Sequence, residues 1–172
     1  GSLAQLYPQA APKQLTNALA YAVKAGKLLK LRRGVYAKSP YNPQELAVKL
    51  YPPSYISLET ILRDHGVIFQ TSAAIACVSY LTRSVTVDGH LLEYRKIKDY
   101  ILTNQSGLIS LGSVAAAGPE RAFLDAVFIF HDYHFDNLRP INWGIVHSLL
   151  PIYNSKVLAS RAGKLEKGVT RE

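Results

Sequence analysis

The stretch Ala25–Pro40, AGKLLKLRRGVYAKSP, decides the expected fold of the first part of the chain. Apolar and basic residues alternate over Leu29–Arg32, which is the pattern of a half-buried strand. Arg33-Gly34 is suited to a turn, and Val35–Ala37 to a returning strand. We therefore predict a β-hairpin whose basic side chains face away from the core.

A helix is predicted directly before this hairpin, over PKQLTNALAYAVK, residues 12–24. Pro12 suits the first turn of a helix, and Gly26 is a natural C-terminal stop. Apolar residues recur at i, i+4, i+7 and i+8 and are expected to form one buried stripe: Leu15, Leu19, Ala22 and Val23. Polar residues occupy the opposite face: Lys13, Asn17, Tyr21 and Lys24.

Leu3 to Tyr7 is predicted to be a further short helix, or the end of one, closed by Pro8. Two helices followed by a basic hairpin are the elements of a winged helix-turn-helix, in that order. The fold predicted for residues 1–40 is therefore a winged helix-turn-helix DNA-binding domain, with the hairpin as its wing.

Positive charge is concentrated in the same region. The chain has a formal net charge of +8, and residues 1–44 contain seven Lys and Arg and no Asp or Glu. The remaining residues contain 13 basic and 12 acidic side chains and are almost neutral. A basic module fused to a near-neutral body indicates that the module binds a polyanion.

Double-stranded DNA is the polyanion that a winged helix predicts. Asn17 and Gln14 are expected to read base edges in a major groove, while the basic residues neutralise phosphates. The predicted DNA-binding residues are Lys13, Gln14, Asn17, Tyr21, Lys24, Lys30, Arg32 and Arg33. The competing interpretation is a sheet edge that lysines protect from aggregation. That interpretation is disfavoured because a protected edge does not require a basic helix beside it.

SPYNP, residues 39–43, is predicted to be a linker to a second domain over residues 44–172. A helix is expected over residues 43–51. A second is expected within SYISLETILRDHG, residues 54–66, with Ser57 as its possible N-cap and its end near Gly66. Asp88-Gly89 predicts a hairpin, and DYILT, residues 99–103, a further strand. A later helix is expected to begin after Pro119. Two closing helices are expected in INWGIVHSLLPIY, residues 141–153, and in NSKVLASRAGKLEK, residues 154–167. The predicted class of this domain is α+β, with a small, mainly antiparallel sheet packed on helices.

Other chemical groups are assigned structural roles. Arg121 and Asp125 are spaced as an i, i+4 ion pair, and Cys77 lies in an apolar run typical of a buried thiol. His131 and His134 at i, i+3 do not have the usual spacing of a helical zinc pair. We expect no catalytic residue, no metal site and no cofactor. The single cysteine and the absence of a long apolar run favour a cytoplasmic protein.

Three segments together resemble the AbiEi family, the antitoxins and transcriptional regulators of bacterial type IV toxin–antitoxin systems. These segments are KLLKLRRGVYA, YPPSYISLETILRDHGVI and GPERAFLDAV, and the resemblance extends over residues 3–150. It implies an N-terminal winged helix that represses its own operon and a C-terminal antitoxin domain. It also implies a nucleotidyltransferase-like toxin as partner, countered by direct contact or indirectly. The first helix is represented only by LAQLY, so the winged helix is expected to be trimmed at its N-terminus.

Two other classes of function remain open at this point. The second domain could be a small nucleic-acid-modifying enzyme that the basic module anchors. Alternatively, the chain could be a protein-interaction module whose basic face binds an acidic partner.

Overall fold

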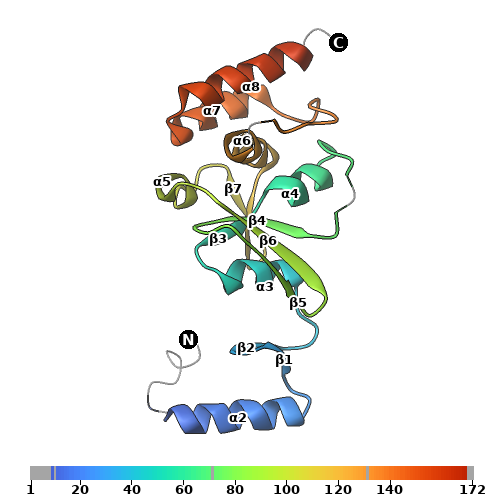
Figure 1. The fold of residues 1–172 in the computed structure, drawn as a ribbon, viewed down its shortest axis with the longest axis vertical. Coiled ribbons are helices and arrows are strands. Elements are labelled where there is room, and N and C mark those ends of the chain that lie inside the picture. The colour runs from blue at the N-terminus through green and yellow to red at the C-terminus, as the bar shows by residue number, and fades with distance from the viewer. Residues whose placement is uncertain (1–8, 10, 71, 131, 170–172) are drawn as a thin grey trace. The chain divides into compact units, whose positions relative to one another are not determined.

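The computed structural model describes residues 9, 11–70, 72–130 and 132–169 of the chain. The chain divides into two compact units (Figure 1). Unit 1 comprises the residues up to Asn42 together with Val87–Gly89, and unit 2 comprises Pro43–Thr86 and the residues from His90 onward.

Unit 1 contains one helix and one hairpin within its described residues. Helix α2 is Pro12–Lys24, and it is followed by strands β1, Leu29–Arg32, and β2, Val35–Ala37, which pair antiparallel. Gly26 and Gly34 have φ angles of +69° and +79°, which glycine adopts without the strain of a Cβ atom. The predicted helix, its stop and the hairpin are confirmed.

The apolar stripe predicted on α2 is less buried than we expected. The helix contains no buried residue, and the four stripe residues, Leu15, Leu19, Ala22 and Val23, are only half-buried. The one helix and the two-stranded hairpin described for unit 1 offer too little surface by themselves to enclose an apolar face. The helix predicted over Leu3–Tyr7 lies outside the described residues, so the winged helix-turn-helix stays a prediction.

Unit 2 is built on a six-stranded sheet with the order β5-β6-β4-β3-β8-β7. Its strands are β3 Ser54–Ile56, β4 Ile75–Ser79, β5 Arg83–Val87, β6 His90–Lys96, β7 Leu108–Leu111 and β8 Val114–Ala117. The pairs β4–β6 and β3–β8 are parallel, whereas β3–β4 and β7–β8 are antiparallel. The unit is α+β as predicted, but its sheet is larger and more mixed than the small, mainly antiparallel sheet that we expected. Parallel pairs join strands distant in sequence, so adjacent turn signals do not reveal them.

Helices cover both faces of this sheet (Figure 1). They are α3 Pro43–Leu50, α4 Leu58–Asp64, α5 Asp99–Leu102, α6 Pro119–Ile129, α7 Trp143–Tyr153 and α8 Lys156–Val169. Helix α3 packs on one face, α4 and α6 lie on the other, and α7 and α8 pack on α6. Four consecutive residues of β4, Ala76 to Ser79, are consequently buried, as expected for a strand covered on both sides.

Local predictions for unit 2 had mixed outcomes. The hairpin at Asp88-Gly89 is confirmed, with φ angles of 50° and 80° that match a type I′ turn. The helix expected to begin after Ser57 and to end near Gly66 is confirmed as α4, although strand β3, which precedes it, was not expected. The strand expected over residues 99–103 is wrong, because Asp99–Leu102 is a short helix. None of the helices in the described residues combines the length and apolar character needed to span a bilayer.

Candidate nucleic-acid interface

The polar face of α2 is open to solvent. Lys13, Asn17, Tyr21 and Lys24 are all exposed, and 70% of the surface of Tyr21 is accessible. Their i, i+4, i+8 and i+11 spacing places them on one side of the helix. The structure thus places the predicted helical contact residues together on one accessible face.

Gln14 has a structural role in addition to its predicted one. Its side-chain oxygen Oε1 accepts a hydrogen bond of 3.1 Å from the backbone N–H of Ala11, the residue that caps α2. The Gln14 N–H in turn donates to the Ala11 carbonyl at 2.9 Å. The amide oxygen of Gln14 therefore has one of its two acceptor positions occupied, while its NH₂ group is available to a base edge.

The hairpin presents a second group of cations. Lys30 pairs with Tyr36 and Arg32 with Val35, and the register shifts between these two pairs. Such an irregularity bends the strand locally. Lys30, Arg32 and the turn residue Arg33 are exposed, while Leu31 is half-buried. The hairpin thus exposes its basic side chains, as predicted.

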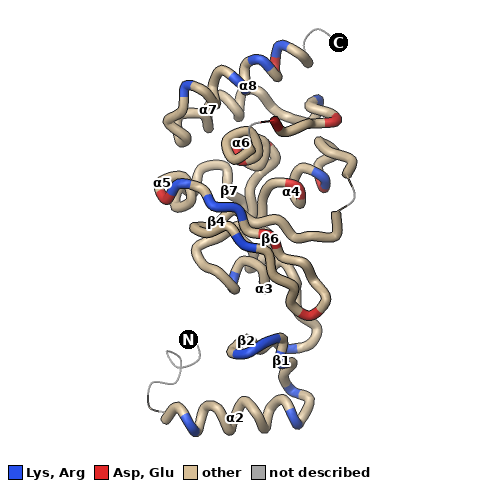
Figure 2. The backbone as a smooth tube through the Cα atoms, in the orientation of Figure 1, with Lys and Arg blue, Asp and Glu red and all other residues tan. Residues whose placement is uncertain are grey.

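Unit 1 carries this charge without compensation from its own helix or strands. The ion pairs in the described part of the chain involve none of its Lys and Arg side chains. Figure 2 shows Lys and Arg along α2 and β1 and at the turn that leads to β2, with no Asp or Glu on these three elements. Unpaired, exposed cations on a helix and an adjacent hairpin create a positive field suited to a phosphate backbone.

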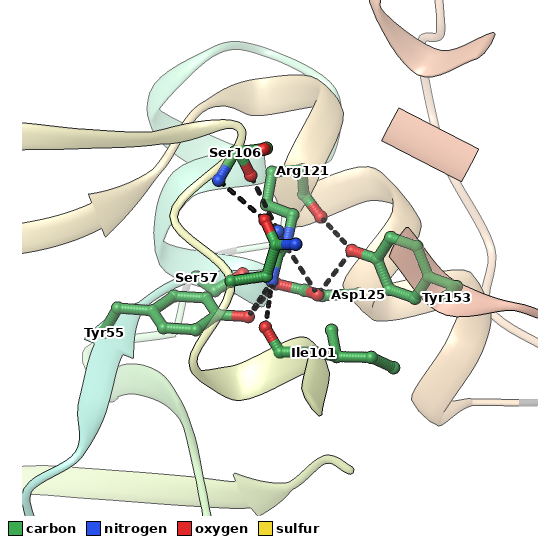
Figure 3. A network of polar contacts seen from close by, with 8 residues as sticks. Tyr55, Ser57, Ile101, Ser106, Arg121, Asp125 and Tyr153 are labelled. Atoms are coloured by element: carbon green, nitrogen blue, oxygen red, sulfur yellow. Dashed lines mark hydrogen bonds and ion pairs between the residues drawn. The ribbon is translucent and has the colours of Figure 1, made fainter. Parts of the chain in front are cut away.

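The Arg121–Asp125 pair lies at the centre of a buried polar network in unit 2 (Figure 3). Both side chains are completely buried, and Nε of Arg121 lies 3.4 Å from Oδ1 of Asp125. The carboxylate accepts hydrogen bonds from the hydroxyls of Tyr55, Ser57 and Tyr153 at 3.0, 2.9 and 2.7 Å. The predicted ion pair is confirmed, but its burial and its hydroxyl partners were not anticipated.

The two Nη atoms of Arg121 donate to backbone oxygens and, at 3.3 Å, to the hydroxyl of Tyr55. Nη1 donates to the carbonyl of Ser106 and Nη2 to that of Ile101, each at 2.7 Å. Burial raises the pKa of the Asp125 carboxyl, while the Arg121 guanidinium and the hydroxyl donors oppose that rise. Because the two charged side chains have no exposed surface, they cannot touch a substrate in this conformation. The network joins α6 to β3, α5 and α7, which is a structural role.

Only part of this network can be found from sequence. The i, i+4 spacing of Arg121 and Asp125 is a local signal. Tyr55 and Ser57 lie more than 60 residues from Asp125, and Tyr153 lies 28 residues from it. Ser57, predicted as a possible N-cap of α4, stands at that position but gives its hydroxyl to Asp125 instead of capping the helix.

Cys77 is fully buried, and burial raises the pKa of its thiol from about 9.0 to about 12, in agreement with the predicted structural role.

His134 is exposed, with Nε2 3.7 Å from Oδ1 of Asp136, while His131 lies outside the described residues. In the described ranges, no three His, Cys, Asp or Glu side chains are grouped closely enough to hold a metal ion.

Comparisons with known proteins do not add a family assignment. No family model matches the chain, and neither a curated protein nor a solved structure matches it. The interpretation of the site therefore rests on the sequence and on the geometry described above.

Proposed function

We propose that the chain is a DNA-binding transcriptional regulator that contacts double-stranded promoter DNA through unit 1. The observation that supports this most directly is the exposed, acid-free basic surface of α2 and the β1–β2 hairpin. In this proposal α2 enters a major groove, where Asn17 and the NH₂ group of Gln14 contact base edges. Lys30, Arg32 and Arg33 of the hairpin neutralise phosphates.

The physiological role in the proposal follows from the resemblance to the AbiEi family. The protein represses its own operon and serves as antitoxin against a nucleotidyltransferase-like toxin. The basic surface supports the DNA-binding half of this role. The antitoxin half rests on the sequence segments within unit 2 and on no contact in the structure.

Titration of fluorescently labelled upstream DNA with the full chain tests the first half. We expect binding that weakens steeply between 50 and 200 mM salt, about 10³-fold or more if six phosphates are neutralised. Random duplex of equal length should bind more weakly than the upstream region. Absence of affinity even at low salt would refute DNA binding and favour the protein-interaction alternative.

Co-expression with the product of the neighbouring gene tests the second half. If that gene encodes a nucleotidyltransferase-like protein that arrests growth, we expect the full chain to restore growth. A toxic neighbour that the chain does not counter would contradict the antitoxin role and leave the DNA-binding proposal standing. Multiple turnover of a nucleic-acid substrate by the purified chain would instead support the enzyme alternative.

A further inference from the structure

Unit 2 has an open hollow of about 240 Å³ between the end of α6, the segment that follows it, and α8. Three aromatic side chains line it, together with one carboxylate and two cations, and aliphatic side chains complete the wall. The residues that matter for its chemistry are Phe130, Asp132, Tyr133, Phe135, Arg161 and Lys164. None of them belongs to unit 1 or to the buried network around Arg121.

The aromatic side chains form a continuous row. The ring centroids of Phe130 and Tyr133 are 5.4 Å apart, and those of Tyr133 and Phe135 are 4.8 Å apart. Phe135 in turn contacts the buried ring of Phe123, with centroids 5.0 Å apart, which anchors the row to the core. All three lining rings are only half-buried, so part of their surface remains accessible to a ligand.

The two cations lie on one side of α8. Arg161 and Lys164 are three residues apart and therefore neighbours on the helix surface. Neither takes part in an ion pair among the described residues, although Asp132 lines the same hollow. Two cations and one carboxylate therefore line the hollow, and the carboxylate of Glu59 interacts with the hydroxyl of Tyr133 at the aromatic wall.

We propose that this hollow binds a mononucleotide. The base lies against the aromatic row, where stacking is favourable for any base because each has a π-face. The phosphate lies between Arg161 and Lys164, and Asp132 accepts a hydrogen bond from the ribose or from an amino group of the base. The volume is slightly below the roughly 300–1,000 Å³ of typical ligand pockets, so a nucleotide would be only partly enclosed by this open hollow.

Calorimetric titration of the full chain with AMP, GMP, CMP and UMP tests the proposal. We expect saturable binding of at least one of them. Because each charge-assisted hydrogen bond contributes about 1.5–3 kcal/mol, the matching nucleoside without phosphate should bind at least about tenfold more weakly. Inorganic phosphate alone should bind more weakly by a similar factor, since it lacks the stacked ring.

Two pairs of substitutions on α8 separate the site from general charge. Arg161→Ala with Lys164→Ala should weaken nucleotide binding at least about tenfold. Lys156→Ala with Lys167→Ala removes the same charge from the same helix outside the hollow, and should change the affinity less than about twofold. Circular dichroism of both variants checks that they remain folded.

A third pair, Lys30→Ala with Arg32→Ala, tests whether the nucleotide binds to unit 1 instead. This double substitution should leave the affinity for the nucleotide unchanged. Three results would each overturn the proposal: no saturable binding of any of the four nucleotides, equal losses in the two α8 variants, or loss of binding in the unit 1 variant. The first two results leave the proposal that unit 1 binds duplex DNA untouched.

Discussion

Asp125 illustrates how a single residue couples distant parts of the chain. Its carboxylate accepts hydroxyl hydrogen bonds from β3, from the start of α4 and from α7, while Arg121 is its i, i+4 partner on α6. The local pair is visible in the sequence because helical spacing is fixed. The hydroxyl partners are not visible, because only the tertiary fold brings them within reach.

Asp125→Ala should destabilise unit 2 by about 3–5 kcal/mol, since it leaves the Arg121 guanidinium buried and without a carboxylate. Urea unfolding followed by circular dichroism measures the change. The matched control is Glu45→Ala, which removes the other i, i+4 pair, that of Glu45 with Lys49 at the surface, and should have a much smaller effect. Equal effects of the two substitutions would contradict the role given to the buried network.

A second prediction at the scale of a single residue concerns the reactivity of the Cys77 thiol. Because it is fully buried and its pKa is raised to about 12, it should not react with a thiol reagent at pH 8 in the native state. In denaturant one thiol per chain should react, since the sequence contains a single cysteine. Rapid reaction of the native protein would show that strand β4 is accessible.

The raised pKa of the Cys77 thiol also predicts how the stability of the protein depends on pH. The unfolded thiol ionises near its ordinary pKa of about 9.0, whereas the folded thiol ionises only near 12. Its contribution to stability is therefore complete below pH 9 and is lost as the pH rises toward 12. Cys77→Ser should show a smaller loss of stability over this range in urea titrations. An identical pH profile for this variant would contradict the assignment.

At the scale of elements, the sequence predicts best where the signal is local. The α2 helix with its Gly26 stop and the two hairpins follow from periodicity and turn residues. Strand β8, VAAA, was missed because alanine has little preference for strands and the segment is only four residues long. The segment DYIL was taken for a strand from its aromatic and β-branched residues, yet it forms one helical turn with Ile101 and Leu102 buried.

The helix and the hairpin of unit 1 should contribute differently to DNA binding. Lys30→Ala with Arg32→Ala should weaken binding to all sequences alike, because phosphate contacts carry no base information. Asn17→Ala should instead reduce the preference for the operator over random duplex, by about 1–3 kcal/mol if Asn17 makes a bidentate base contact. Parallel titrations of operator and random DNA measure both effects. An unchanged specificity ratio for Asn17→Ala would show that α2 is not the recognition element.

At the scale of the whole molecule, composition and structure divide the chain at nearly the same place. Residues 1–44 contain no acid, and the first compact unit consists of the residues up to Asn42 and the hairpin turn Val87–Gly89. The division into units does not by itself assign a function to either. The mixed topology of unit 2 could not be predicted from the sequence, because pairings such as β3–β8 join segments about 60 residues apart.

A fragment of residues 43–172, which omits residues 1–42, should fold on its own, because about 130 residues can enclose a core. The core of unit 2, including the Arg121–Asp125 network, lies within this fragment. We expect a cooperative urea transition for the fragment and loss of operator binding. A fragment that is folded but retains operator affinity would move the DNA-binding surface to unit 2.

The salt dependence of operator binding tests the central claim most directly, because it counts the phosphates that the protein neutralises. Each one contributes about −0.9 to the slope of log K against log salt. Removing Lys30 and Arg32 together should make the slope less steep by about 2 relative to the full chain, and Asn17→Ala should leave it unchanged. Equal slopes for the full chain and the Lys30→Ala, Arg32→Ala variant would contradict the claim that the hairpin lies along the DNA backbone.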